Sequence, residues 1–149
     1  MREYKFRGKD KNTGKWVYGF YLEQDTYNMG SKNTKKDLLI KDAGVIVQNS
    51  KYDSGTVIDK ETIGQYTGLK DRNMKEIYEG DIVKIKNENV EIICEIIYLD
   101  TAFRTKKFVY GSYYDCLYYW YANDFEIEVI GNVWEDSDLL NDNKNTESY

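Results

Sequence analysis

The chain has 149 residues, 41% of them hydrophobic and 15% aromatic, which suits one domain with a real core and room for a smaller lobe. Its formal net charge is −5, and it contains no histidine. The lack of histidine excludes Ser-His-Asp and Cys-His nucleophile activation, and it excludes zinc sites built on imidazole.

The charge is distributed unevenly along the chain. Residues 1–41 carry ten Lys or Arg against five Asp or Glu, which gives +5, whereas residues 123–149 carry one against eight, which gives −7. A basic N-terminal part and an acidic C-terminal part could meet within one chain or between subunits. Ordinary solvated charge of limited energetic weight is the simpler interpretation.

The cysteines, Cys94 and Cys116, lack the paired spacing of a disulfide framework or a metal site. The N-terminal residues show no apolar segment typical of a signal peptide, and no apolar run approaches the roughly 20 residues that span a bilayer. No phosphate-binding GxxxxGK[ST] or GxGxxG motif occurs. We therefore expect a cytoplasmic protein without membrane contact, cofactor or metal.

Residues 1–60 are predicted to form an N-terminal region of β-hairpins. Segments 3–8 and 15–22 alternate in polarity on either side of an Asn-Thr-Gly turn, which predicts one hairpin. The polar segment 23–36 is predicted to be a mobile loop. Two short apolar runs within residues 38–47 predict a second hairpin, and residues 56–58 predict a short strand.

Residues 61–140 are predicted to form the core, as an SH3-like or other β-barrel, and residues 141–149 a frayed acidic tail. The stretch from Thr62 to Ile85 predicts a strand, a tight loop at Lys70–Asn73, a strand, and a sharp entry into a further strand. Its structural turns are assigned to Gly64, Gly68, Gly80 and Asp81.

The rest of the core predicts further strands. Residues 90–99 are apolar on both faces, which is typical of a central strand, and residues 102–110 and 125–134 predict two more. Residues 135–140 predict a single helical turn with an acidic start.

Residues 112–122 are ambiguous. Tyr114, Leu117, Tyr118 and Tyr121 fit a helical stripe, but the Tyr and Trp content favours a strand or irregular structure, which we expect here.

These elements amount to about eight to ten short strands with Gly and Asn turns. They predict a mainly β fold, either a small antiparallel sandwich or an SH3-like barrel, with at most short helical turns.

Carboxylates are the remaining candidates for chemistry. Glu79 and Asp81 lie on either side of Gly80 and could bind a metal ion or act as acid and base, which would make the chain a cryptic carboxylate-dependent enzyme. The simpler interpretation is that Gly80 supplies an unusual backbone angle while Asp81 accepts hydrogen bonds from nearby amides. Asp124, Glu126 and Glu128 are most simply the wet face of an edge strand.

Nucleic-acid binding is an alternative function. The predicted N-terminal hairpin is basic and carries aromatic residues on which bases could stack, at Lys5, Arg7, Lys9, Lys11, Lys15, Trp16 and Tyr18. The isoelectric point near 4.9 argues against strong phosphate affinity.

Three segments resemble one protein family. EYKFRGKDKNTGKWVYGFYL, TIGQYTGLKDRNMKEIYEGDIVKI and EVIGNVWEDSDLL are similar, in this order, to the opening, central and closing segments of the YopX-like proteins of phages and prophages. Met74 departs from the pattern, because the family commonly has glycine after Asn73. The resemblance implies a small β-rich protein of phage origin, and it implies no activity and no catalytic residues. The EGDIVKI segment also resembles the first strand of SH3-like barrels.

The functional hypothesis is a non-enzymatic accessory protein that acts through protein contacts and self-associates. Tyr and Trp are enriched at interface hot spots, and no catalytic apparatus is evident. The candidate interaction surface surrounds the central loop at Tyr66, Leu69, Lys70, Asp71, Arg72, Asn73, Glu76 and Tyr78. On this hypothesis, Asp71→Ala leaves the melting temperature unchanged and weakens partner binding.

Overall fold

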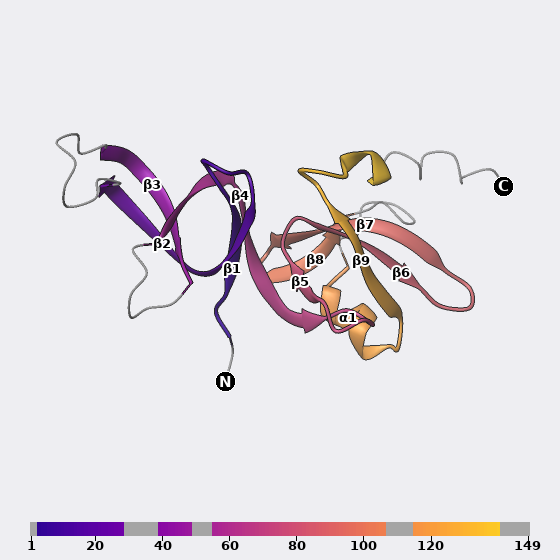
Figure 1. Ribbon diagram of the computed structural model, residues 1–149. Coiled ribbons are helices and arrows are strands. Elements are labelled where there is room, and N and C mark those ends of the chain that lie inside the picture. The colour runs from indigo at the N-terminus through magenta and orange to yellow at the C-terminus, as the bar shows by residue number, and fades with distance from the viewer. Residues whose placement is uncertain (1–2, 29–38, 49–54, 107–114, 141–149) are drawn as a thin grey trace. The chain divides into compact units, whose positions relative to one another are not determined.

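The computed structural model describes residues 3–28, 39–48, 55–106 and 115–140, and the chain divides into two compact units at Gln65 and Tyr66. The described residues form nine strands, one short α-helix and one 3-10 helix (Figure 1). The mainly β class with only short helical segments is therefore confirmed. The division lies a few residues beyond the expected boundary at 60/61.

The N-terminal unit is a sheet that closes on itself. It contains β1 (Phe6–Asp10), β2 (Trp16–Asn28), β3 (Leu39–Val47) and the first part of β4 (Thr56–Lys70), paired antiparallel in that order. Because β1 also pairs with β4, the four strands form a ring (Figure 1). Closure is tight: a Cβ atom on Gly8 of β1 would lie 2.6 Å from the Cδ1 atom of Ile58 of β4.

The first hairpin prediction is confirmed by the antiparallel pairing of β1 with β2. Two other predictions for this region are wrong. β2 continues as a strand to Asn28, so residues 23–28 are not a loop, while residues 29–36 lie outside the described part. Residues 39–47 form the single strand β3 and not a hairpin, because their polar middle pairs with β2, where Ala43 lies opposite Gln24. Backbone pairing with β2 therefore keeps residues 41–44 extended, although their sequence is typical of a turn.

Asp10 fixes the turn between β1 and β2. Its Oδ1 atom accepts a hydrogen bond from the Asn12 amide at 2.8 Å, and its Oδ2 atom accepts one from the Thr13 hydroxyl at 2.9 Å. The hydrogen bond from Asn12 is the main reason that the pKa of the Asp10 carboxyl lies below its ordinary value. The carboxylate keeps these bonds until the pH falls through that lowered pKa.

The C-terminal unit is built on a four-stranded antiparallel sheet in the order β8-β7-β6-β9. Its strands are β6 (Asp81–Lys86), β7 (Glu91–Leu99), β8 (Ala102–Lys106) and β9 (Glu126–Asn132), and the short β5 (Glu76–Tyr78) pairs with the end of β4. The alternating buried positions form one core with residues of the helix: Ile77, Val83, Ile85, Ile92, Cys94, Ile96, Leu117, Trp120, Ile127 and Val129.

Residues 117–122 form the helix α1 (Leu117–Ala122), so the expectation of strand or irregular structure is wrong there. Leu117 and Trp120 are three residues apart and therefore share one helix face, which is buried in the core. The Trp120 ring packs edge-on against Phe125 at a centroid distance of 4.8 Å, and its indole nitrogen donates to the Thr105 hydroxyl at 3.3 Å. These packing and hydrogen-bond contacts outweigh the strand preference of the aromatic residues.

Three predicted strands of this unit agree with the structure where it describes them: residues 90–99 contain β7, residues 102–110 contain β8, and residues 125–134 contain β9. A barrel over residues 61–140 stays a prediction. β7 lies between two strands and β9 lies at an edge of the sheet. The 3-10 helix Ser137–Leu140 is the predicted helical turn. The predicted tail at 141–149 lies outside the described residues.

Candidate functional site

The loop between β4 and β5 is a five-residue turn closed by backbone hydrogen bonds. The Asp71 amide donates to the Lys75 carbonyl at 2.8 Å, and the Met74 amide donates to the Asp71 carbonyl at 3.0 Å. Aspartate is favoured at the first position of such turns because its side chain can accept a bond from the amide two residues on. Here the Asp71 Oδ1 atom accepts from the amides of Asn73 at 2.8 Å and Lys75 at 2.9 Å.

Asp71 also holds this turn against the edge of β9. Its Oδ2 atom accepts a hydrogen bond from the Val129 amide at 3.0 Å, and the neighbouring Arg72 amide donates to the Ile127 carbonyl at 2.8 Å. The Asp71 side chain is only 5% exposed. The turn thus occupies hydrogen-bonding groups of an edge strand that would otherwise be open to another chain.

Met74 adopts the left-handed backbone conformation in this turn, with φ at +65°, and its side chain is 70% exposed. An L-residue pays about 1–2 kcal/mol for that conformation, and glycine does not. We expect Met74→Gly to raise the free energy of unfolding by about 1 kcal/mol, because the greater freedom of glycine in the unfolded chain offsets part of the gain. Urea unfolding at equal protein concentration measures the change.

Asn73→Gly is the matched control for this prediction, because it places the glycine one residue earlier. Among the described non-glycine residues with positive φ, Met74 is present and Asn73 is not. The control should therefore lower stability. A gain of equal size in both variants would contradict the conformational explanation.

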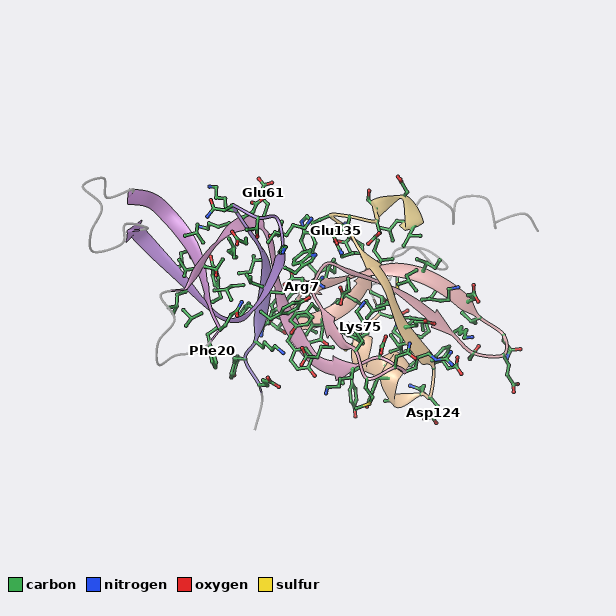
Figure 2. The ribbon with its side chains drawn as sticks, in the orientation of Figure 1. Arg7, Phe20, Glu61, Lys75, Asp124 and Glu135 are labelled. Atoms are coloured by element: carbon green, nitrogen blue, oxygen red, sulfur yellow. The ribbon has the colours of Figure 1, made fainter. Side chains whose placement is uncertain are left out.

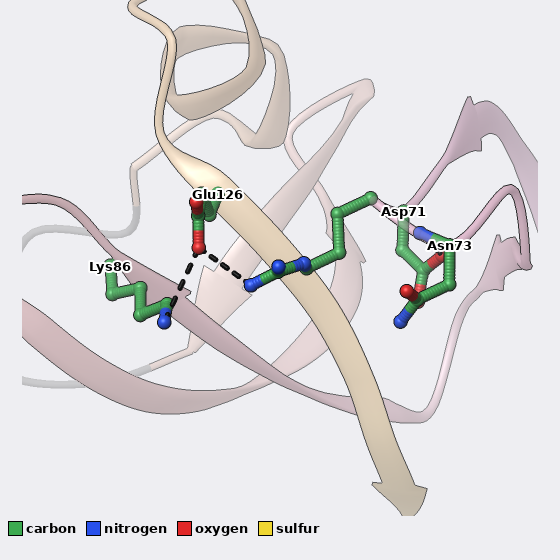
Figure 3. Close-up of polar contacts among 5 residues, drawn as sticks. Asp71, Asn73, Lys86 and Glu126 are labelled. Atoms are coloured by element: carbon green, nitrogen blue, oxygen red, sulfur yellow. Dashed lines mark hydrogen bonds and ion pairs between the residues drawn. The ribbon is translucent and has the colours of Figure 1, made fainter.

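A small charge cluster lies beside the turn. Glu126 of β9 accepts from the Arg72 guanidinium at 2.7 Å and lies 3.3 Å from the Lys86 ammonium (Figure 3). The side chains of Arg72 and Glu126 are 43% and 51% exposed, so the pair is solvated and its contribution to stability is small. Its effect is to hold Arg72 along β9.

A groove of about 680 Å³ lies between this turn and the connection from α1 to β9. One wall comes from the end of β4 and the turn, and the other comes from the end of α1 and the start of β9. Its lining mixes aromatic, aliphatic and charged side chains: Tyr66, Gly68, Leu69, Lys70, Asp71, Arg72, Met74, Tyr121, Asp124, Phe125, Glu126 and Ile127. The site therefore offers an amphipathic recess suited to binding a surface.

The structure brings five of the eight predicted surface residues to this groove, namely Tyr66, Leu69, Lys70, Asp71 and Arg72. Asn73 is exposed on the turn. Tyr78 is 2% exposed, packs against Tyr66 at a ring distance of 5.5 Å, and donates its hydroxyl to Glu76 at 2.6 Å. Tyr78 is therefore part of the core and is not available to a partner.

The predicted role of Asp71 requires a correction. Its carboxylate is buried and accepts three backbone hydrogen bonds, so we expect its replacement to lower the melting temperature. It shapes the surface by holding the turn.

The predicted turn residues take different roles. Gly80, with φ at +80°, and Asp81, whose Oδ2 atom accepts from the Tyr78 amide at 2.7 Å, form the sharp entry into β6. Gly68, with φ at +88°, lies where the pairing of β4 with β5 loses its regular register, which is a bulge in the strand. Gly64 is not at a turn, because it lies within β4 opposite Arg7.

Asp81 is 1% exposed and serves this backbone contact, which is the simpler of the two interpretations of the Glu79 and Asp81 pair. Within the described ranges, no three His, Cys, Asp or Glu side chains gather closely enough to hold a metal ion.

Sequence reasoning did not place several groove residues, including Met74, Tyr121 and Phe125, in the interaction surface. The four consecutive aromatic residues 118–121 were the available signal. Their exposure depends on helix formation, which turns Trp120 inward and leaves Tyr118, Tyr119 and Tyr121 at 65%, 53% and 50% exposed.

In the basic N-terminal hairpin, Trp16 contacts two basic residues of the same unit. The Arg7 guanidinium lies 4.8 Å and the Lys9 ammonium 5.4 Å from the centroid of the Trp16 ring. Arg7 itself is 6% exposed. These cation–π contacts engage the indole that base stacking would need, so this geometry lends little support to nucleic-acid binding.

Comparison with known proteins decides the family. A family model described as YopX protein matches residues 5–141, nearly the whole chain. The chain belongs to the YopX family. The resemblance drawn from three segments is therefore confirmed. A comparison of this YopX-family chain with curated proteins finds no match.

A solved structure has a similar fold. The crystal structure of protein EF1440 from Enterococcus faecalis matches with a TM-score of 0.50 and 24% sequence identity, over 94% of this chain and 99% of that chain. This likeness supports the fold alone. In the part of the YopX-family chain that the structure describes, no helix reaches the length and apolar character that crossing a bilayer requires.

Proposed function

We propose that this YopX-family protein is a non-enzymatic accessory protein of phages and prophages, which acts in the host cytoplasm through protein contacts and associates with itself. The supporting observation is the surface around the groove. Tyr118, Tyr121 and Met74 are at least half exposed, beside or within a recess lined by further aromatic residues. Covering exposed aromatic rings with a partner is favourable because it removes apolar surface from water. The tyrosine hydroxyl can still bind water at the edge of such an interface.

The charge pattern supports the same function. The segment from Leu117 to Asn123 contains no charged residue. A partner can therefore cover it without the free-energy cost of desolvating a charged side chain. The chain as a whole carries a net charge of −5, which opposes association of two copies at long range. Contacts at short range must therefore supply the attraction.

Multi-angle light scattering over a concentration series tests the proposal on the intact chain. We expect the mass to rise from the 17.6 kDa of one chain toward twice that value as concentration increases. The dimer should persist at moderate salt, because the ring contacts are not screened. A constant monomer mass up to millimolar concentration would reject self-association.

A further inference from the structure

Two exposed groups of opposite charge line the groove and come from segments far apart in the sequence. Lys70 belongs to the β4 wall, and Asp124 belongs to the connection between α1 and β9. Figure 2 shows Asp124 at the periphery of the C-terminal unit, pointing away from its strands. Asp124 has φ at +58°, which an aspartate tolerates better than most residues.

Lys70 and Asp124 differ from the other charged pair of the groove. Arg72 and Glu126 bind each other at 2.7 Å. For Lys70 and Asp124, by contrast, no ion pair is found among the described residues. One positive and one negative group thus remain available to a partner, with the uncharged Met74 and Tyr121 also lining the groove.

A surface with this arrangement is complementary to itself. In a two-fold symmetric dimer, residue i of one copy meets residue j of the other, and j meets i. A two-fold axis through the groove would bring each Lys70 toward the Asp124 of the second copy, so that two attractive pairs form. The uncharged Met74 and Tyr121 can meet their own copies near the axis without repulsion.

We infer, resting on the proposed function, that the groove and the exposed side of α1 form a two-fold symmetric interface with a second copy of this chain. Lys70 of each copy pairs with Asp124 of the other. The occupant of the groove is therefore the same surface of a second molecule. The two rim pairs set its orientation, while Tyr121 and Met74 supply buried apolar area.

Charge reversal tests this arrangement. In Lys70→Glu two acidic groups face each other at both rim positions, and in Asp124→Lys two basic groups do. We expect each single variant to raise the dimer dissociation constant by about tenfold, measured by light scattering or sedimentation. An equimolar mixture of the two variants should recover dimers of wild-type affinity, because both rim pairs are then of opposite charge.

Native mass spectrometry of that mixture provides a direct readout, since the two variants differ in mass. Heterodimers should exceed the proportion expected from random pairing. Recovery by mixing also demonstrates that both variants are folded, including Asp124→Lys at its left-handed position.

Lys75→Glu is the matched control. Lys75 is exposed at the end of the turn between β4 and β5, and it is not among the residues that line the groove. This variant changes the net charge as Lys70→Glu does, and it should leave the dissociation constant unchanged.

The outcomes separate this inference from the proposed function. If the wild-type chain forms dimers that Lys70→Glu and Lys75→Glu leave equally intact, the interface lies elsewhere, and the inference fails while self-association stands. If the double variant in one chain recovers dimers but the mixture does not, the pair is intramolecular and the inference again fails. A wild-type monomer rejects both.

Discussion

Replacing Gly80 with alanine is expected to lower the free energy of unfolding by about 3 kcal/mol or more. Gly80 has φ at +80°, where an L-residue is strained. A Cβ atom at this position would also lie 2.2 Å from the Trp134 ring. The backbone cannot move aside easily, because the Gly80 amide donates to the Ile96 carbonyl at 2.8 Å and its carbonyl accepts from the Val133 amide at 2.9 Å.

Gly68→Ala is the control that isolates backbone strain from overlap. Gly68 has φ at +88°, and a Cβ atom there would meet nothing within 4 Å. Its substitution should cost only about 1–2 kcal/mol. Urea unfolding followed by circular dichroism compares the two variants on the same scale.

Replacing Trp134 with the smaller leucine provides the second control. In Gly80→Ala combined with Trp134→Leu, the overlapping ring is gone, so the double variant should lose less than the sum of the two single variants. Equal losses in Gly80→Ala and Gly68→Ala, together with simple additivity at Gly80 and Trp134, would contradict the packing explanation.

Asp71→Ala is the second substitution with a large expected effect, a loss of about 3 kcal/mol in the free energy of unfolding. The substitution removes the acceptor from three backbone amides, of which that of Val129 lies in the buried edge of β9. It also leaves space at a side chain that is 5% exposed. Thermal and urea unfolding measure the loss.

Two variants at the same turn sharpen this prediction. Asp71→Asn keeps one acceptor oxygen and should therefore give an intermediate loss. Asn73→Ala changes an exposed side chain while its amide still donates to Asp71, so it should have little effect. If Asp71→Ala melts like Asn73→Ala, the carboxylate does not hold the turn, and the assignment of Asp71 to structure is wrong.

Because the turn both stabilises the fold and lines the groove, the choice of variant matters for testing the proposed interface. Asp71 supports a turn whose residues Arg72 and Met74 line the groove, beside Lys70 at the end of β4. Loss of association in an Asp71 variant would therefore report on both folding and contact. Lys70 is the better probe, because its side chain is exposed and the backbone bonds of the turn do not depend on it.

Local patterns in the sequence were sufficient for much of the fold. The β-branched run at 90–99 predicted a central strand, and β7 does lie between β6 and β8, although its buried residues alternate along one face. The Gly80-Asp81 pair predicted the sharp entry into β6 for a local reason: Gly80 supplies a left-handed backbone angle, and the Asp81 carboxylate accepts a hydrogen bond from the Tyr78 amide three residues earlier. Both features depend on neighbours within a few positions.

The groove and the helix depended on contacts between distant segments. The Asp71 carboxylate accepts a hydrogen bond from the Val129 amide, 58 residues away, and no local property of a Lys-Asp-Arg-Asn turn reveals that donor. Likewise, the aromatic residues 118–121 could serve a strand or a helix, and the contact of Trp120 with Thr105 of β8, together with its packing against nearby Phe125, selected the helix. Helix formation leaves Tyr121 exposed in the same groove that Lys70 lines. The sequence by itself determined the mainly β class, the first hairpin and the sharp entry into β6. Tertiary packing decided that residues 23–28 and 41–44 continue as strands, that residues 117–122 form a helix, and which side chains share a surface, because these outcomes depend on partners in other segments.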